Sequence, residues 1–393
     1  MEVIRASHAP VTLYTEEYGQ PSEVWIHRQV TGLPDWIGAV AAKDFVNRET
    51  FSVPEEINLG WGTDLQHRLA HLRWGLRKLR WIPDDELEVL EDAARLRTGD
   101  PKLLHCHFLW NAEFALAISH ELGIPLIVTA HGSDVNRARI DMAYRARLEI
   151  VFLNCSCMIA VSKFIERVLL EIGCPKEKIR VLPLGAPIPS QPAPRTGEIF
   201  AWICIGSLLP VKGHEFLIRA FAKAHKQNGK MELLLVGDGE GRVALEHLAK
   251  ELGVSDTIQF KGIQSPEQVE KLLQQAHGCV LASIVEQGSK GLKEEGLPIS
   301  LVEAAAHGLP LVATDCGGIP EICLDGENGL LVPCEDAQAL SDALLKVTMD
   351  NSLAVSMGHK SLEYVQANYA LDDCTQRLAE LYASILGDRG EPA

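Results

Sequence analysis

The chain has 393 residues, of which 47% are hydrophobic and 23% charged, a mixture that excludes a disordered, collagen-like or coiled-coil protein. Its formal net charge is −16, and residues 196–393 alone carry 15 basic and 28 acidic side chains. Because neither half has the basic surplus of a nucleic-acid-binding module, we expect no nucleic-acid partner. Domains of about 100–200 residues are usual, so this length indicates two or three.

The sequence has no segment that predicts a membrane-spanning helix, a signal peptide or a disulfide framework. No run of about 18 apolar residues is present, and residues 1–10 lack the basic start and apolar stretch of a signal peptide. We therefore expect a cytoplasmic protein. The ten cysteines are scattered through apolar segments, which predicts reduced thiols rather than a disulfide framework.

The first half of the chain alternates short apolar segments with segments of helical period. This pattern is typical of parallel strands joined by crossover helices. We expect an N-terminal, Rossmann-like domain over residues 1–185. Its predicted strands are 10–14, 37–42, 102–105, 125–129, 157–161 and 179–182.

A basic helix is predicted between the second and third of these strands. Residues 65–81 (LQHRLAHLRWGLRKLRW) place five leucines on one helical stripe and add five basic residues and two tryptophans. On so acidic a protein, this composition indicates docking on a membrane surface, which would place the protein at the inner face of a membrane. An ordinary packed amphipathic helix explains the same pattern.

The proline-rich segment 186–198 follows neither period and is predicted to be a linker. A second α/β domain is expected over 199–370. Residues 371–393 add an amphipathic helix and a tail, and the sequence leaves open which domain the helix contacts. The strands of the second domain are predicted at 200–206, 231–237, 257–262, 277–283, 309–314 and 328–333. The fold class is thus α/β, with two doubly wound domains facing each other across a cleft.

The chemistry concentrates in a predicted helix that starts after Pro298. Glu295 precedes this helix and Glu303 lies in its early turns. The free amides of Ile299 and Ser300 and the helix dipole would favour a diphosphate at this end. Solvated charges near a helix start are the alternative explanation for the two carboxylates.

The surrounding string is more specific than the two glutamates. E-G-L-P-I-S-L-V-E-A, followed by H-G-L-P-L-V-A-T-D and G-G-I-P-E, resembles the Glu-x7-Glu donor signature of retaining GT-B glycosyltransferases of the GT4 group. Residues 21–33 (PSEVWIHRQVTGL) are similar to the opening segment of exopolysaccharide and colanic-acid members of this family. Segments that resemble the family are 21–33, 103–135, 160–183, 203–221, 233–242 and 294–322.

The resemblance implies a GT-B fold and transfer of a hexose from a nucleotide diphosphate sugar, UDP- or GDP-linked, to a saccharide acceptor that is lipid-linked. It implies no tightly bound cofactor. The anomeric configuration would be retained by front-face substitution, in which the departing phosphate oxygen helps to deprotonate the acceptor hydroxyl. Positioning and charge stabilisation would then supply most of the catalysis.

The resemblance also implies a role for single residues. Glu303 would bind the ribose hydroxyls, and Glu295 would orient the donor sugar. Lys212 would neutralise the diphosphate, and His131 would lie near the anomeric carbon. The remaining implied donor contacts are Gly206, Ser207, Gly213, Ile263, Pro298, Ile299 and Ser300.

Acceptor contacts are expected at Ser22, Glu23 and His107. His105 and His107 form an H-x-H pair, but no third ligand follows at a useful spacing. We therefore predict no metal site.

The sequence departs from the family at three places. The family has an Arg at the position of Ser207, so one of two cations expected at the diphosphate is missing. Lys290 or Lys293 is a candidate replacement. The usual P-N-G-V-D reads P-L-G-A-P at 183–187, and EEYGQPSEVW at 16–25 replaces a Gly-rich acceptor loop.

Other functions share this architecture. A nucleotide-sugar epimerase or a sugar-phosphate-accepting synthase would use the same donor site. A catalytically weak nucleotide-sugar-binding partner is a further alternative, favoured by Ser207. A nicotinamide-dependent dehydrogenase would need a G-x-G-x-x-G fingerprint, which the glycines of GDGEG at 237–241 do not form.

Overall fold

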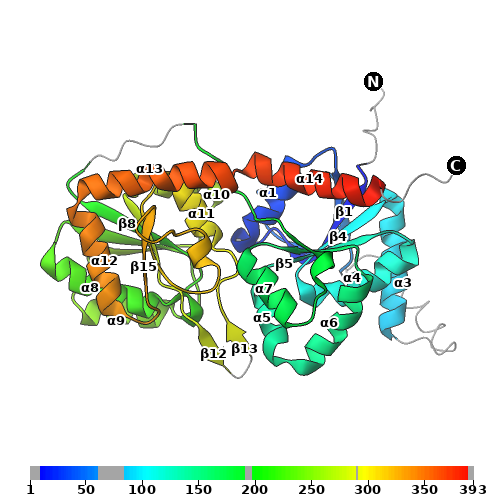
Figure 1. Cartoon of the computed structure of the whole chain (residues 1–393), viewed down its shortest axis with the longest axis horizontal. Coiled ribbons are helices and arrows are strands. Elements are labelled where there is room, and N and C mark those ends of the chain that lie inside the picture. Colours follow the sequence, from blue (N-terminus) through cyan, green and yellow to red (C-terminus); the bar gives the residue numbers. More distant parts are fainter. Residues whose placement is uncertain (1–8, 61–83, 191–196, 289–290, 388–393) are drawn as a thin grey trace.

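The computed structural model describes residues 9–60, 84–190, 197–288 and 291–387. They form two parallel-sheet domains side by side, with helices on both faces of each sheet (Figure 1). This is the GT-B arrangement predicted from the sequence. The basic segment 65–81 lies outside the described residues.

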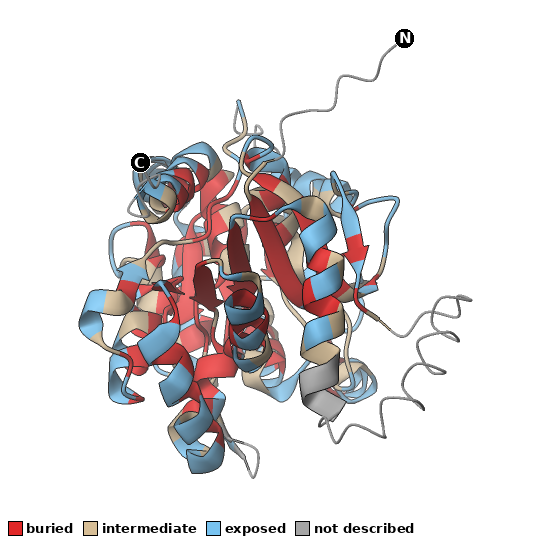
Figure 2. Ribbon diagram, turned by 90° about the vertical axis from the view of Figure 1, so that its right-hand side faces the viewer, coloured by how far each residue is buried: buried red, intermediate tan, exposed pale blue. Residues whose placement is uncertain are grey.

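The first sheet has seven parallel strands in the order β3-β2-β1-β4-β5-β6-β7. Strands β4, β5 and β6 are buried along their whole length, which explains their continuous apolar sequences (Figure 2). The strands are β1 (Val11–Tyr18), β2 (Ile37–Phe45), β3 (Glu56–Asn58), β4 (Leu103–His107), β5 (Leu126–Ala130), β6 (Cys157–Ala160) and β7 (Ile179–Val181). The helices are α1 (Val24–Gly32), α3 (Asp84–Leu96), α4 (Leu109–Leu122), α5 (Ser133–Ile140), α6 (Met142–Asn154) and α7 (Lys163–Glu171).

The second sheet has six parallel strands in the order β10-β9-β8-β11-β14-β15. Its strands are β8 (Phe200–Ile205), β9 (Met231–Val236), β10 (Ile258–Gly262), β11 (Gly278–Leu281), β14 (Leu311–Thr314) and β15 (Gly329–Val332). A short hairpin of β12 (Glu286–Gly288) and β13 (Gly291–Lys293) extends towards α5 of the first domain.

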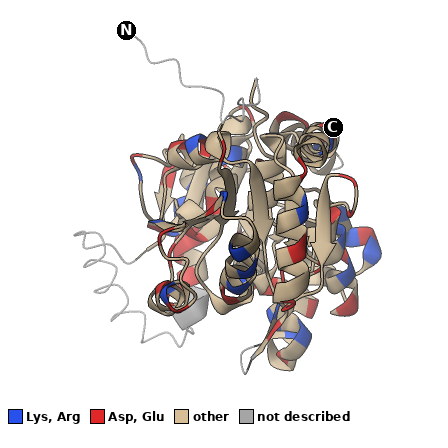
Figure 3. Ribbon diagram, turned by 90° about the vertical axis from the view of Figure 1, so that its left-hand side faces the viewer, with Lys and Arg blue, Asp and Glu red and all other residues tan. Residues whose placement is uncertain are grey.

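The helices of the second domain carry acidic and basic residues interspersed (Figure 3), several of them as ion pairs one turn apart. Such exposed pairs each contribute little to stability. The helices are α8 (His214–Gln227), α9 (Arg242–Glu251), α10 (Pro266–Gln275), α11 (Ile299–Ala306), α12 (Ala337–Met349) and α13 (Asn351–Asn368).

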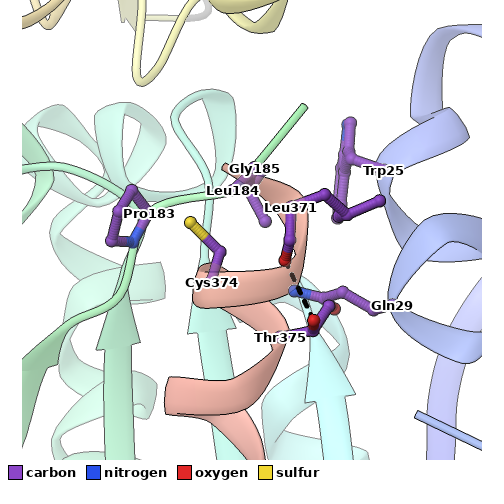
Figure 4. A pocket seen from close by; sticks show the side chains of 8 residues that line it. All are labelled: Trp25, Gln29, Pro183, Leu184, Gly185, Leu371, Cys374 and Thr375. Carbon is purple, nitrogen blue, oxygen red and sulfur yellow. Dashed lines mark hydrogen bonds between the residues drawn. The ribbon is translucent and has the colours of Figure 1, made fainter. Parts of the chain in front are cut away.

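The chain crosses between the domains twice, and the two crossings are hydrogen-bonded to each other. Ala186 donates its amide to the carbonyl of Tyr369, and its own carbonyl accepts from the amide of Leu371. Gly185 sits so close to Leu371 that a side chain there would overlap it. Figure 4 shows this junction, where α1, the segment after β7 and the start of the last helix meet around a small pocket.

The last helix, α14 (Leu371–Gly387), packs on the first domain, which answers the question that the sequence left open (Figure 1). Its Tyr382 is fully buried, and the hydroxyl lies 2.5 Å from Nδ1 of His105. The other ring nitrogen of His105 lies 2.7 Å from the hydroxyl of Thr129. Burial lowers the pKa of His105 to about 3, so the ring is neutral and uses one nitrogen as donor and one as acceptor.

Tyr382→Phe should lower the free energy of unfolding by about 1–3 kcal/mol, because it leaves a buried ring nitrogen of His105 without a partner. Urea denaturation measures this loss. Tyr364→Phe is the control: it removes a half-buried bond to the carbonyl of Glu321, which still accepts from Tyr369. Equal losses in the two variants would contradict the role given to Tyr382.

Candidate functional site

A pocket lies between the domains, at the carboxyl end of β8 and the amino end of α11. Ligands of doubly wound folds bind at this edge of the sheet. The first domain contributes one wall through α1 and the residues before it. The lining residues are Pro21, Ser22, Val24, Trp25, Arg28, Ile205, Gly206, Ser207, Lys212, Gln264, Pro266, Val269, Glu295, Leu297, Pro298, Ile299, Ser300 and Glu303.

An ion pair between Lys212 and the buried Glu295 lines this pocket. Nζ of Lys212 lies 2.5 Å from Oε1 of Glu295, and the hydroxyl of Ser283 donates to the same oxygen at 2.7 Å. Glu295 is only 7% exposed. Burial alone would raise the pKa of Glu295, but the charge and hydrogen bond of Lys212 and the bond from Ser283 lower it. Glu295 is therefore ionised although it is buried.

Helix α11 begins at Ile299, as predicted, and no side chain caps its first turn. Gly308, which closes the following turn, has a positive φ of 67° that favours glycine. The first amides of α11 belong to Ile299 and Ser300, both of which line the pocket. Partial positive charge therefore faces the same space as Lys212.

Arg28 reaches this pocket from the other domain, and the sequence analysis did not identify it. Its Nη2 lies 2.6 Å from Oε1 of Glu303, and the two side chains are 17% and 12% exposed. Arg28 lies in the middle of α1, within the segment 21–33 that resembles the family. Helical period alone does not reveal that this face of α1 contacts the second domain.

His131 follows β5 and lies in a cluster of rings. Its ring centre is 4.1 Å from that of Trp25 and 4.5 Å from that of Phe108. Its Nε2 is 3.1 Å from Nδ1 of His107. Burial lowers the pKa of His131 well below its usual range, so the ring is neutral. His131 itself does not line the pocket, whereas Trp25 does.

The loop at residues 294–297 is held by the first domain. Arg139 pairs with the carboxylate of Glu294 at 2.9 Å, and the side chain of Asn136 donates to the carbonyl of Glu294 at 3.2 Å. Ser162 donates its hydroxyl to the carbonyl of Gly296 at 2.8 Å. The same loop carries Glu295, so the domain contact and the buried carboxylate are parts of one segment.

Most of the expected donor contacts line the pocket, but Gly213 and Ile263 do not. Gly213 does not line the pocket but has a φ of 62°, and a side chain there would overlap the carbonyl of Ala282. Ile263 is 67% exposed and does not line the pocket, whereas the next residue, Gln264, does. The expected residues that line the pocket are Gly206, Ser207, Lys212, Glu295, Pro298, Ile299, Ser300 and Glu303.

Of the three expected acceptor contacts, Ser22 lines the pocket and the other two do not. Ser22 is exposed and lines the pocket, and Glu23 beside it is half-buried. His107 is fully buried, and its Nδ1 lies 3.1 Å from Nε2 of His131, so its contact with an acceptor stays a prediction.

Two further expectations concern charge and metals. Lys293 pairs with Glu286 within the hairpin at 3.2 Å, whereas Lys290 lies outside the described residues. Among residues 9–60, 84–190, 197–288 and 291–387, no group of three or more His, Cys, Asp or Glu side chains could hold a metal ion. Over the same residues, no helix is long and apolar enough to cross a membrane.

Comparison with known families finds glycosyltransferase models that match both parts of the chain. A family model described as glycosyl transferases group 1 matches residues 191–363, and one described as Glycosyltransferase Family 4 matches residues 51–188. The chain belongs to the group 1 glycosyltransferases. The two matches divide at the proline-rich segment between the two sheets.

Individual relatives agree with this family. WcaL of Salmonella typhimurium, assigned to colanic acid biosynthesis as a glycosyltransferase, is 29% identical over 95% of this chain and 100% of its own. A GDP-mannose-dependent phosphatidylinositol monomannoside mannosyltransferase of Mycobacterium tuberculosis is 27% identical over 65% of this chain and 68% of its own. The crystal structure of Anabaena Alr3699/HepE with UDP and glucose shares the fold, with a TM-score of 0.77 and 17% identity over 96% of this chain and 100% of the other.

Gly296→Ala should separate this glycosyltransferase's loop at 294–297 from the first domain, because the methyl group would overlap the carbonyl oxygen of His131. We expect a loss of about 1–3 kcal/mol in the free energy of unfolding. Gly229→Ala is the control, since a methyl group there meets nothing within 4 Å. Thermal and urea denaturation measure both variants, and equal stability of the two would refute the close contact.

Glu23→Gln should change how stability depends on pH. Burial, with a smaller contribution from Glu17, raises the pKa of Glu23 to about 7. The folded protein therefore binds more protons than the unfolded chain between pH 4.5 and pH 7, and stability falls as pH rises through this window. The fall in unfolding free energy from pH 5 to pH 8 should be smaller in Glu23→Gln. Glu55→Gln is the control, because Glu55 is exposed. Its unfolding free energy should fall between pH 5 and pH 8 by as much as that of the native protein.

Proposed function

We propose that this glycosyltransferase transfers a hexose, with retention of configuration, from a nucleoside diphosphate sugar to a lipid-linked saccharide in exopolysaccharide biosynthesis. The observation that carries the proposal is the interdomain pocket in which Glu295, paired with Lys212, stands eight residues before Glu303. The second domain, 199–370, would bind the donor and the first, 1–185, the acceptor, with 186–198 as the linker.

The relatives support the donor class. One is named for dependence on GDP-mannose and another for colanic acid biosynthesis, and Alr3699/HepE was crystallised with UDP and glucose. A UDP- or GDP-hexose fits a pocket that offers a cation, helix amides and two carboxylates. The proposal of a lipid-linked acceptor rests on the family resemblance together with the basic sequence at 65–81. The same basic sequence supports the proposed position at the inner face of a membrane.

The positions of the residues are consistent with the roles that the resemblance implies. Lys212 and the first amides of α11 would stabilise the negative charge that develops on the departing diphosphate. Ser207 and Gly206 would lie beside that diphosphate. Glu295, ionised and fixed by Ser283, would accept hydrogen bonds from the donor sugar.

Two more groups would complete the centre. Glu303 would accept from the ribose hydroxyls. The neutral ring of His131 would help to position the donor sugar, beside Trp25 at the edge of the pocket. In front-face substitution the bond from the anomeric carbon to the diphosphate oxygen breaks, and the acceptor oxygen bonds to the same face of that carbon. The acceptor's proton passes to the departing phosphate oxygen, so no carboxylate base is needed.

The donor site can be tested by charge at Ser207. Ser207→Asp would place a carboxylate beside the diphosphate, whereas Ser207→Asn adds a side chain of the same size without charge. UDP, GDP, ADP, CMP and NAD are added to each protein, and the melting temperature is measured. We expect one nucleoside diphosphate to stabilise the native protein and Ser207→Asn but not Ser207→Asp.

Two results would contradict the proposal. One is the absence of stabilisation by any nucleoside diphosphate in the native protein, and the other is equal stabilisation of the Asp and Asn variants. With the matching nucleotide sugar and a saccharide acceptor, the anomeric coupling of the product in proton spectra reports retention or inversion.

A further inference from the structure

We propose that Arg28 supplies the second cation of the donor diphosphate site, and that Glu303 holds Arg28 in place until the ribose of the donor displaces it. The inference rests on the proposed function, because it concerns the same pocket. It assigns to a residue of the first domain the charge that Ser207 does not provide in the second.

The position of Arg28 brings its guanidinium to the right space. Arg28 lines the same pocket as Ser207, Lys212 and the first residues of α11. Its Nη2 lies 2.6 Å from Glu303, the carboxylate that is expected to bind ribose. The guanidinium is therefore already at the nucleotide end of the pocket, where ribose and diphosphate would be adjacent.

The guanidinium also has an unused donor. Nη1 of Arg28 is buried and has no hydrogen-bond partner among the described residues. An Arg side chain carries five donors in a planar fork that matches phosphate oxygens two at a time. This donor is available to a ligand oxygen once the guanidinium turns.

The charges around the pocket balance without a ligand. Its described lining contains two cations, Lys212 and Arg28, and two anions, Glu295 and Glu303, which form two pairs. Lys212 is thus largely neutralised by a partner that is itself buried. Lys293, an alternative source of charge, pairs with Glu286 in the hairpin. The ribose hydroxyls of the donor would take over Glu303, the partner of Arg28.

Binding would then proceed as an exchange. The ribose hydroxyls donate to Glu303, which releases the guanidinium of Arg28. The guanidinium turns to the diphosphate and donates to its oxygens from the side opposite Lys212. Because Arg28 belongs to the first domain and Lys212 to the second, a diphosphate between them draws the domains together, whereas a nucleoside without phosphate does not.

A different role for Arg28 has different consequences. If it only ties α1 to α11, its loss would change the affinity for nucleosides and nucleoside diphosphates by the same factor. If it is a diphosphate ligand, its loss would affect only the ligands that carry phosphate. The ratio of the two affinities therefore separates the roles.

The experiment measures binding of UDP against uridine, and of GDP against guanosine, by calorimetry on the full chain. We expect Arg28→Gln to weaken the nucleoside diphosphate by about 10- to 100-fold, the range for losing a charge-assisted bond. The affinity of Arg28→Gln for the nucleoside should be equal to or higher than that of the native protein, because Glu303 no longer pairs with Arg28 and can accept from the ribose. Arg28→Lys should lose less, and Ser207→Arg in the Arg28→Gln background should restore most of the affinity.

Arg97→Gln is the matched control. It removes an arginine that pairs with Glu121 on the surface of the same domain at 3.0 Å, away from the pocket. In Arg97→Gln, the ratio of the affinity for the nucleoside diphosphate to the affinity for the nucleoside should equal that of the native protein. An unchanged ratio in Arg28→Gln would overturn the inference. Failure of the native protein to bind any nucleoside diphosphate would instead overturn the proposed function.

A second variant covers the case in which Arg28→Gln does not fold. Glu303→Gln removes the anion that holds Arg28, and it alters the ribose contact equally for both ligands. The ratio of diphosphate to nucleoside affinity should therefore rise above the native value. A ratio that stays the same or falls would overturn the inference.

Discussion

The arrangement of the two domains depends on a close approach of two backbones. Gly296 of the second domain packs directly against His131 and Gly132 of the first, and a side chain on Gly296 would not fit. This contact is reinforced by the hydrogen bond from Ser162 and the ion pair of Arg139 with the loop. Because Glu295 is the neighbour of Gly296 in sequence, the position of a buried carboxylate is set by the contact between domains.

Electrostatics impose a second constraint on the pocket. A carboxylate as buried as Glu295 stays ionised only when a cation and a hydrogen-bond donor compensate the loss of water, and Lys212 and Ser283 do so. Helix α11 adds partial positive charge at the same place. The charged side chains of the pocket form two ion pairs, Lys212 with Glu295 and Arg28 with Glu303.

Most of the fold could be predicted from the sequence because the strands are buried on both faces and read as short apolar runs. Strand β3 escaped prediction because its three residues lie at the sheet edge, and two of them are exposed. The helix after Pro298 and its end near Gly308 were predicted by local signals. Arg28 was not, since only tertiary structure shows which face of α1 contacts Glu303. His107 was picked out by its H-x-H motif, and the sequence did not reveal that the side chain is fully buried.

The path of the last helix has a consequence for the order in which the protein can form on the ribosome. Helix α14 follows the second domain in the chain but packs into the core of the first domain, where Tyr382 contacts His105 and Trp36. The first domain therefore emerges early with part of its core open. It becomes complete only after the second domain has been synthesised, so both domains reach their final packing together.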